Sequence, residues 1–163
     1  MNGISSRLAA ALFALCFTAT LKAQAVQGLQ VEVQTPHRSV PLDGAVSLNV
    51  ALRNTRSNAA LNVGRRPDWS RDGGLALFVM KPDGALEPLP AAARAPGATE
   101  PQRDLRIDAG SALSLRRTIR VADFASAPGE YRLVAEYRPA RGDARSAVSA
   151  PVSIRVQAAR APN

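Results

Sequence analysis

The sequence predicts an all-β fold, either an antiparallel β-sandwich or a small barrel, with about seven to nine strands. Short segments in which apolar and polar residues alternate recur along most of the chain, which is the pattern of half-buried strands. Turn residues such as Pro-Asp-Gly separate these segments at short spacing. Beyond the first 25 residues, no segment has the periodicity of an amphipathic helix, and no repeat or second domain is visible.

The N-terminus has the pattern of a secretory signal peptide. Arg7 supplies a positive charge, residues 8–20 form a short apolar run, and residues 23–25 are an Ala-x-Ala cleavage signal. A membrane-spanning helix needs about 20 apolar residues, and this run is shorter. We therefore expect cleavage after Ala25, export to the periplasm or the medium, and no transmembrane segment in the mature chain. The expected organisation is a signal peptide over 1–25, one domain over 26–157 and a disordered tail over 158–163.

Cys16 is the single cysteine of the chain and lies within the expected leader. A lipidated cysteine needs a small residue just before it, whereas Leu15 occupies that place, and a separate cleavage signal follows. We therefore interpret Cys16 as a residue of the leader. The mature chain then has no cysteine, which excludes disulfides, thiol catalysis and zinc-thiolate sites.

The chain is strongly basic, with a formal net charge of +8. The leader carries Arg7 and Lys22 and no acid, so the mature chain keeps a charge of +6, and Lys81 is its single lysine. An arginine-rich surface favours anionic partners, although an ordinary positive surface on an exported protein is the simpler interpretation. We expect a protein partner or an anionic ligand and not nucleic acid.

Three strands are expected before the first long loop. Residues 28–34 (GLQVEVQ) alternate cleanly, so this first strand buries one face. Residues 46–52 (VSLNVAL) alternate in the same way, and the turn residues Asn54 and Thr55 follow them. A short third strand passes through residues 61–63.

The middle of the chain is expected to hold a hairpin and a flexible excursion. Residues 75–80 (LALFVM) are apolar on both faces, which is typical of an interior strand. Residues 86–89 return from a Lys-Pro-Asp-Gly turn, and Pro88 confines this arm to a sheet edge. Residues 90–103 are rich in alanine, proline and glycine and have no period, with at most one helical turn over 91–94.

A short strand over 105–107 turns into a longer strand over 113–121. One face of the longer strand carries Leu113, Leu115, Ile119 and Val121. Arg117 falls on the same apolar face. Either a bulge re-aims this side chain, or its charged head reaches solvent past the sheet edge.

Residues 128–137 (PGEYRLVAEY) form the segment around which we expect the other strands to pack, since a Pro-Gly turn leads into a regular alternation. Its inward row is Tyr131, Leu133, Ala135 and Tyr137. The last strand is expected over 148–156. Its inward row is Val148, Ala150, Val152, Ile154 and Val156. Pro151 lies in this strand, which therefore pairs on one edge or carries a break.

The corner from Asp123 to Tyr131 resembles the tyrosine corner of immunoglobulin-like domains, in which a tyrosine hydroxyl bonds backbone across the corner. The motifs LNVALRNT (48–55) and KPDG (81–84) add to this. The layout is similar to bacterial immunoglobulin-like modules, and among them to the BsuPI-type proteinase-inhibitor domain. The resemblance covers about residues 30–156 and implies an immunoglobulin-like antiparallel β-sandwich. The long arginine-rich and Ala/Pro-rich loops depart from that family.

The sequence contains no recognisable catalytic constellation. His37 is the single histidine, lies in a polar loop and has no serine-nucleophile motif to accompany it. One histidine without a mature cysteine makes a zinc site improbable, and Asp68, Asp72 and Asp83 lack the spacing of a calcium loop. We expect a protein that is not an enzyme and that has no metal or other cofactor.

The loop over 64–74 places the single tryptophan among arginines. The candidate ligand-binding residues are Arg65, Arg66, Trp69 and Arg71. An indole ring beside guanidinium groups can stack on a ligand and pair an anion. In the alternative interpretation, Trp69 covers the end of the core under its own loop while the arginines are solvated. Arg116, Arg117 and Arg120 form a second basic group, in which Arg116 and Arg120 share one face of a strand and are expected to be exposed.

Two functions remain open from the sequence. The first is a non-catalytic exported binding or accessory module that contacts a protein or an anionic ligand through loops at one end of the sandwich. The alternative is a BsuPI-like proteinase inhibitor that presents residues 90–103 or 138–146 as an extended loop.

Overall fold

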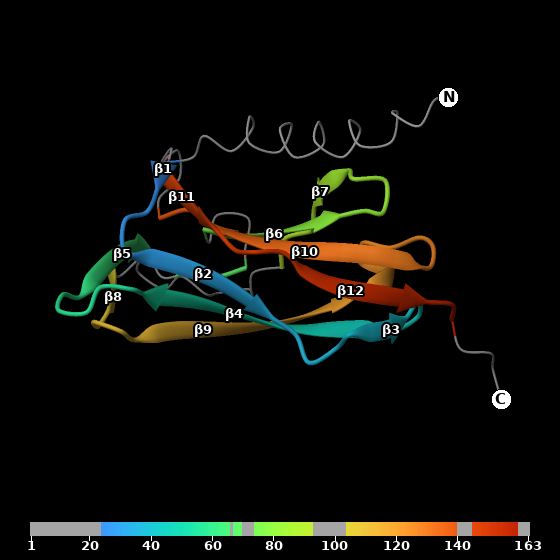
Figure 1. Ribbon diagram of the computed structural model, residues 1–163, viewed down its shortest axis with the longest axis horizontal. Coiled ribbons are helices and arrows are strands. Elements are labelled where there is room, and N and C mark those ends of the chain that lie inside the picture. The colour runs from blue at the N-terminus through green and yellow to red at the C-terminus, as the bar shows by residue number, and fades with distance from the viewer. Residues whose placement is uncertain (1–23, 66, 70–73, 93–103, 140–144, 160–163) are drawn as a thin grey trace, which may run out of the picture.

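The computed structural model of the protein describes residues 24–65, 67–69, 74–92, 104–139 and 145–159, and strands make up most of it (Figure 1). In chain order the strands are β1 (Gln24–Ala25), β2 (Leu29–Gln34), β3 (Ser39–Pro41), β4 (Ala45–Asn54), β5 (Leu61–Arg65), β6 (Leu75–Met80), β7 (Leu86–Pro88), β8 (Asp104–Ile107), β9 (Ala112–Arg120), β10 (Gly129–Tyr137), β11 (Arg145–Val148) and β12 (Val152–Gln157). A short 3-10 turn, η1 (Val121–Asp123), follows β9. The predicted all-β sandwich is confirmed, but the described residues form twelve strands where about seven to nine were expected.

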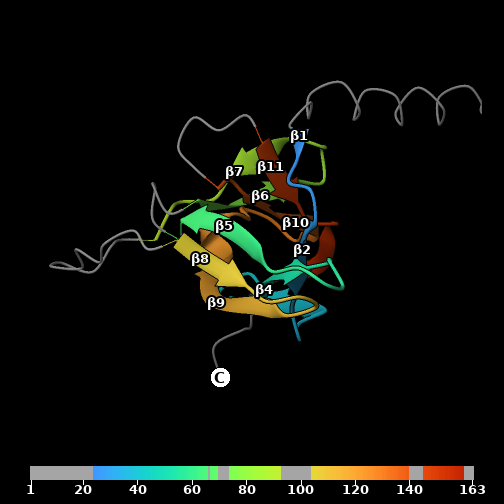
Figure 2. The same ribbon diagram turned by 90° about the vertical axis from the view of Figure 1, so that its left-hand side faces the viewer.

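Two sheets form the layers of the sandwich. The smaller sheet has the order β2-β4-β9 and is antiparallel throughout. In the seven-stranded sheet β10 is central, with β6 on one side and β11 and β12 along the other. The two-stranded ribbon β5-β8 lies on one side of the sandwich, between the levels of β6 and β9 (Figure 2).

Alternation along the strands explains which faces meet. On β4 the side chains of Val46, Leu48, Val50 and Leu52 are almost completely buried. On β10 the predicted inward row is confirmed, because Tyr131, Leu133, Ala135 and Tyr137 are all buried. These two rows face each other across the core.

Tyr131 makes the predicted corner. Its hydroxyl donates to the carbonyl oxygen of Ala127 at 2.9 Å, and its ring meets that of Phe124 edge-on with centroids 5.7 Å apart. Tyr137, at the other end of the row, donates its hydroxyl to the carbonyl oxygen of Val63 at 2.5 Å. The two tyrosines therefore fix both ends of β10 to neighbouring backbone.

We expect Tyr131→Phe to lower the free energy of unfolding by about 1 kcal/mol, since it removes one hydrogen bond and keeps the ring. The corresponding fall in melting temperature is about 4 °C for a domain of this size. Urea unfolding followed by circular dichroism measures the change. An unaltered midpoint would show that the corner bond contributes nothing to stability.

The last expected strand is divided in two. β11 ends at Val148 and β12 begins at Val152, so of the two alternatives that Pro151 left open, the break is confirmed. At the break, Ser149 donates its N–H to the carbonyl of Ala135 and accepts the Ala135 N–H on its hydroxyl at 3.0 Å. The inward row predicted for this strand was wrong for the residues before β12, Val148 and Ala150.

The break shifts the alternation by one residue. Ala147 is buried in place of Val148, which is 39% exposed, and Ala150 is exposed as well. From Val152 onward the predicted alternation holds, with Ile154 and Val156 buried.

Three further expectations concern the ends and the long loop. Residues 1–23 of the expected leader lie outside the described residues. Its last two residues, 24 and 25, form β1. Most of the excursion over 90–103 also lies outside them, and its described residues Ala91 and Ala92 are not helical. Within the described ranges, no helix has the length and apolar character needed to cross a membrane.

Candidate functional site

Trp69 lies at the end of the sandwich where β6 begins. It is half-buried and packs against the hydrophobic core. Its carbonyl oxygen accepts the N–H of Ala92 at 2.8 Å, and the neighbouring Asp68 forms a parallel bridge with Gly74. These contacts fix the tryptophan backbone between the start of β6 and the segment that follows β7.

Arg117 covers the tryptophan ring. Its guanidinium carbon lies 5.5 Å from the ring centroid, and its Nη2 donates to the carbonyl oxygen of Pro90. Burial lowers the pKa of the Arg117 guanidinium, because the charged form loses water. Arginine is still charged at neutral pH, so a cation is held against the indole face.

The position of Arg117 decides between the two explanations of its inward placement. The register of β4 and β9 runs without a shift from Ala45 opposite Arg120 to Arg53 opposite Ala112. No bulge re-aims the side chain, and Arg117 stands opposite Leu48 on the inner face. Since β9 is the last strand of its sheet, the guanidinium extends past the edge, where it meets Trp69 and Pro90.

The indole Nε1 of Trp69 is buried and has no hydrogen-bond partner among the residues that the structure describes. The ring therefore contributes packing and a cation-π contact, while its N–H stays unpaired within that part of the chain. Such a pair contributes about 0.5–2 kcal/mol, depending on how far the cation is desolvated. Trp69 is thus an anchor for its loop.

Of the predicted ligand-binding residues, the structure describes the side chain of Trp69 alone. Arg65 ends β5, and its side chain lies outside the described part, as do Arg66 and Arg71. Their gathering around Trp69 stays a prediction. Sequence reasoning missed that Arg117 joins the site. The sequence did show Arg117 as a charged residue on an apolar strand face. That pattern does not indicate which distant residue the arginine contacts.

The second basic group is exposed as predicted. Arg116 and Arg120 lie on the outer face of β9. Arg120 pairs with Asp123 at 3.0 Å in the corner that follows. This face of the small sheet therefore presents positive charge at regular spacing.

His37 and Asp83 lie in a connection and in a turn. His37 donates its backbone N–H to the hydroxyl of Thr35 in the connection between β2 and β3. Asp83 accepts the N–H of Ala85 at 2.9 Å, which confirms its role as a turn residue. Within the described ranges, no three His, Cys, Asp or Glu side chains gather so that they could hold a metal ion.

Comparison with known proteins gives a fold and no family. No family model matches the chain, and no curated protein matches it. The structure is similar to the sporulation control protein Spo0M of Bacillus subtilis, with a TM-score of 0.51 and 11% identity over 82% of this chain and 51% of that chain. At that identity the similarity shows the fold alone.

Two other solved structures match with lower TM-scores. A β-glucosidase from Listeria innocua in complex with glucose has a TM-score of 0.43 and 10% identity, over 80% of this chain and 16% of that chain. The alkylpurine DNA glycosylase AlkC of Pseudomonas fluorescens, bound to DNA, has a TM-score of 0.40 and 13% identity, over 85% of this chain and 32% of that chain. The chain thus spans about half of the Spo0M structure and less of the others.

Proposed function

We propose that the chain is a non-catalytic, exported binding module of immunoglobulin-like type. It contacts a protein or an anionic ligand through the loops at the end of the sandwich where Trp69 lies. The observation that carries this proposal is the stacking of Arg117 on Trp69, because it fixes the arginine-bearing loop to a regular strand.

The loop is attached at several points. It starts from β5, which pairs with β8, and it ends at Gly74, whose carbonyl accepts the N–H of Arg138 at 2.8 Å. Trp69 fixes its middle through Arg117 and through Ala92. A loop held in this way loses less conformational entropy on binding than a free one, which favours its use as a contact surface.

Charge supports an anionic partner for this loop. The eight consecutive positions 65–72 around the anchor hold three arginines, Arg65, Arg66 and Arg71, against two acids, Asp68 and Asp72. Attraction between an arginine group and an anion depends on salt, because exposed charges are screened at physiological ionic strength. Salt-dependent retention on an anionic matrix is therefore a direct measure of this surface.

We expect the triple variant Arg65→Ala, Arg66→Ala, Arg71→Ala to elute from heparin at clearly lower NaCl than the wild type. The matched control removes three exposed arginines, Arg38, Arg132 and Arg155, from the opposite end of the sandwich. Both variants lose the same net charge, so the difference between them isolates the loop. Equal elution of the two triples would show that net charge alone determines retention and would overturn the proposed site.

The alternative of a BsuPI-like inhibitor concerns the segments over 90–103 and 138–146. The structure fixes the start of the first segment, since the Pro90 carbonyl and the Ala92 N–H are both bonded. An inhibitory loop also needs such fixed ends. Titration of trypsin-like and subtilisin-like proteases with the purified protein separates the two functions, and cleavage without inhibition would reject the inhibitor.

A further inference from the structure

β9 is an edge strand of the small sheet. In its sheet it pairs with β4 on one side, and within the described part of the chain no strand pairs with the other. Figure 2 shows β9 at the margin of the small sheet. It is nine residues long, regular and free of proline. Most protein sheets shorten, bend or cover such an edge, because unpaired N–H and C=O groups are a template for another strand.

The hydrogen-bond pattern shows which backbone groups face the open side. Opposing residues in an antiparallel pair alternate between bonded and non-bonded pairs. Asn54 donates to Ser111, and Val121 donates to Gly44, so the bonded pairs of β9 fall on its odd-numbered residues. The N–H and C=O groups of the even-numbered residues therefore point away from β4. In β9 these residues are Ala112, Ser114, Arg116, Thr118 and Arg120.

All five residues are exposed. Thr118 contacts Ser47 and Arg120 contacts Asp123, both through side chains, and these contacts leave the outward backbone groups unbonded. Arg116 is exposed and has no polar contact within the described part of the chain. Within the described residues, a strand laid against β9 would thus find unbonded donors and acceptors together with a positive side-chain row.

Charge decides what fits this edge. A second copy of the chain would bring Arg116 and Arg120 against the same two arginines, and facing like charges destabilise a strand pair. The chain's own segment over 90–103 contains three prolines, which lack the N–H that a ladder needs. Neither of these occupants matches the edge.

We propose that β9 accepts an extended acidic segment of a partner protein as an additional strand. Main-chain bonds to Ser114, Arg116 and Thr118 hold the segment, and its Asp or Glu side chains lie opposite Arg116 and Arg120. The segment would bond the backbone of β9 and would not require Arg65, Arg66 or Arg71, although Arg117 of the same strand contacts Trp69. The inference therefore extends the proposed function and can fail independently of it.

The test uses a labelled peptide of about eight residues with alternating Thr and Glu, a strand length that matches β9. We expect saturable binding by fluorescence anisotropy, together with slower hydrogen exchange at the amides of Ser114, Arg116 and Thr118 by NMR. A peptide with Lys in place of Glu is expected to show no saturation. No saturable binding of the Glu peptide at millimolar concentration would overturn the proposal.

Two variants separate strand addition from simple charge attraction. Thr118→Pro removes a donor on the open side and leaves the bonds to β4 intact, so it is expected to weaken binding about tenfold. Arg116→Glu is expected to weaken binding by a similar factor, whereas the control Arg155→Glu makes the same charge change on β12 with little effect. Equal affinity of Thr118→Pro and wild type would show attraction without strand pairing.

A second peptide covers the case in which Thr118→Pro does not fold. Methylation of alternate peptide nitrogens removes the donors on the peptide side and keeps its charge. Two such peptides carry the methyl groups on one or the other edge of the extended chain. We expect the peptide whose methylated edge faces β9 to lose binding to the wild-type protein. Binding by both methylated peptides would contradict strand addition.

Discussion

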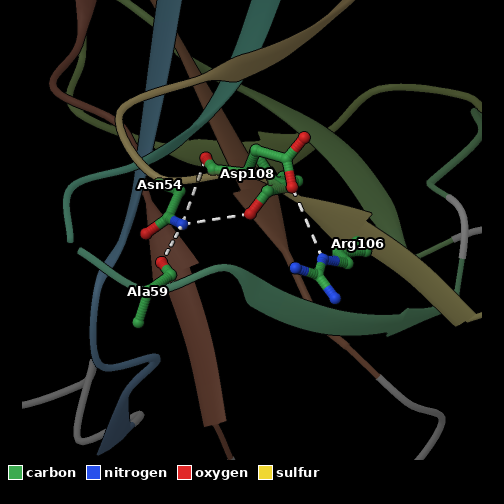
Figure 3. Close-up of polar contacts among 5 residues, drawn as sticks. Asn54, Ala59, Arg106 and Asp108 are labelled. Carbon is green, nitrogen blue, oxygen red and sulfur yellow. Dashed lines mark hydrogen bonds and ion pairs between the residues drawn. The ribbon is translucent and has the colours of Figure 1, made fainter. Parts of the chain in front are cut away.

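Asn54→Ala is expected to lower the free energy of unfolding by about 3 kcal/mol, because a fully buried amide that bonds one buried and two partly buried carbonyl groups is lost. The Asn54 side chain is fully buried. Its Nδ2 donates to the carbonyl oxygens of Ala59 at 2.9 Å, Ile107 at 3.0 Å and Asp108 at 3.2 Å (Figure 3). Its Oδ1 accepts the N–H of Arg56 at 3.0 Å. Urea unfolding of the variant measures the loss.

Asn49→Ala is the matched control for this variant. Asn49 lies on the same strand, is only half-buried and makes no side-chain hydrogen bond within the described residues. The same chemical change there is expected to alter stability by no more than about 0.5 kcal/mol. Equal losses in the two variants would contradict the role assigned to the Asn54 bonds, since both would then report on strand composition alone.

Gly74→Ala is expected to destabilise the fold by about 3 kcal/mol through two additive effects. Gly74 has a φ of +80°, a left-handed conformation that disfavours a side chain. An added Cβ would also lie 2.7 Å from the carbonyl oxygen of Arg138 and 3.3 Å from the ring of Tyr137. Thermal unfolding followed by circular dichroism reports the combined cost.

Gly84→Ala separates the two effects. Gly84 has a φ of +86°, and a Cβ there would meet no atom within 4 Å. We expect this variant to cost only about 1 kcal/mol, the share that comes from the backbone conformation. If Gly74→Ala destabilised no more than Gly84→Ala, the close approach of Arg138 to Gly74 would have no energetic weight.

The strands could be predicted from the sequence because alternation is a local property. β4 and β10 bury the residues that their patterns indicate, and the hydroxyl of Tyr131 bonds where the corner motif placed it. β1 and β3 were not predicted, since they are two and three residues long and form by parallel pairing with distant strands. Burial of Asn54 was also missed, because an asparagine after a strand has the same local pattern whether it is exposed or enclosed.

The candidate site could be predicted only in part. Trp69 was singled out by its arginine neighbours in sequence, whereas the arginine that stacks on it comes from β9. The conflict at Arg117, a charge on an apolar face, was visible in the alternation. Where the Arg117 side chain goes depends on the position of the sheet edge and of Pro90. The alternation of apolar and polar residues gives no information on either.

The central place of β10 also sets an order on folding. β6 pairs locally with β7 but gains its second partner only when β10 is present, and β4 pairs with β2 but gains its second partner only with β9. The second ladder of each strand therefore joins segments far apart in the chain. Closing such long loops costs entropy before any contact compensates for it, which slows folding. During synthesis, the sheet that holds Tyr131 and Tyr137 therefore forms only after the last third of the chain has emerged.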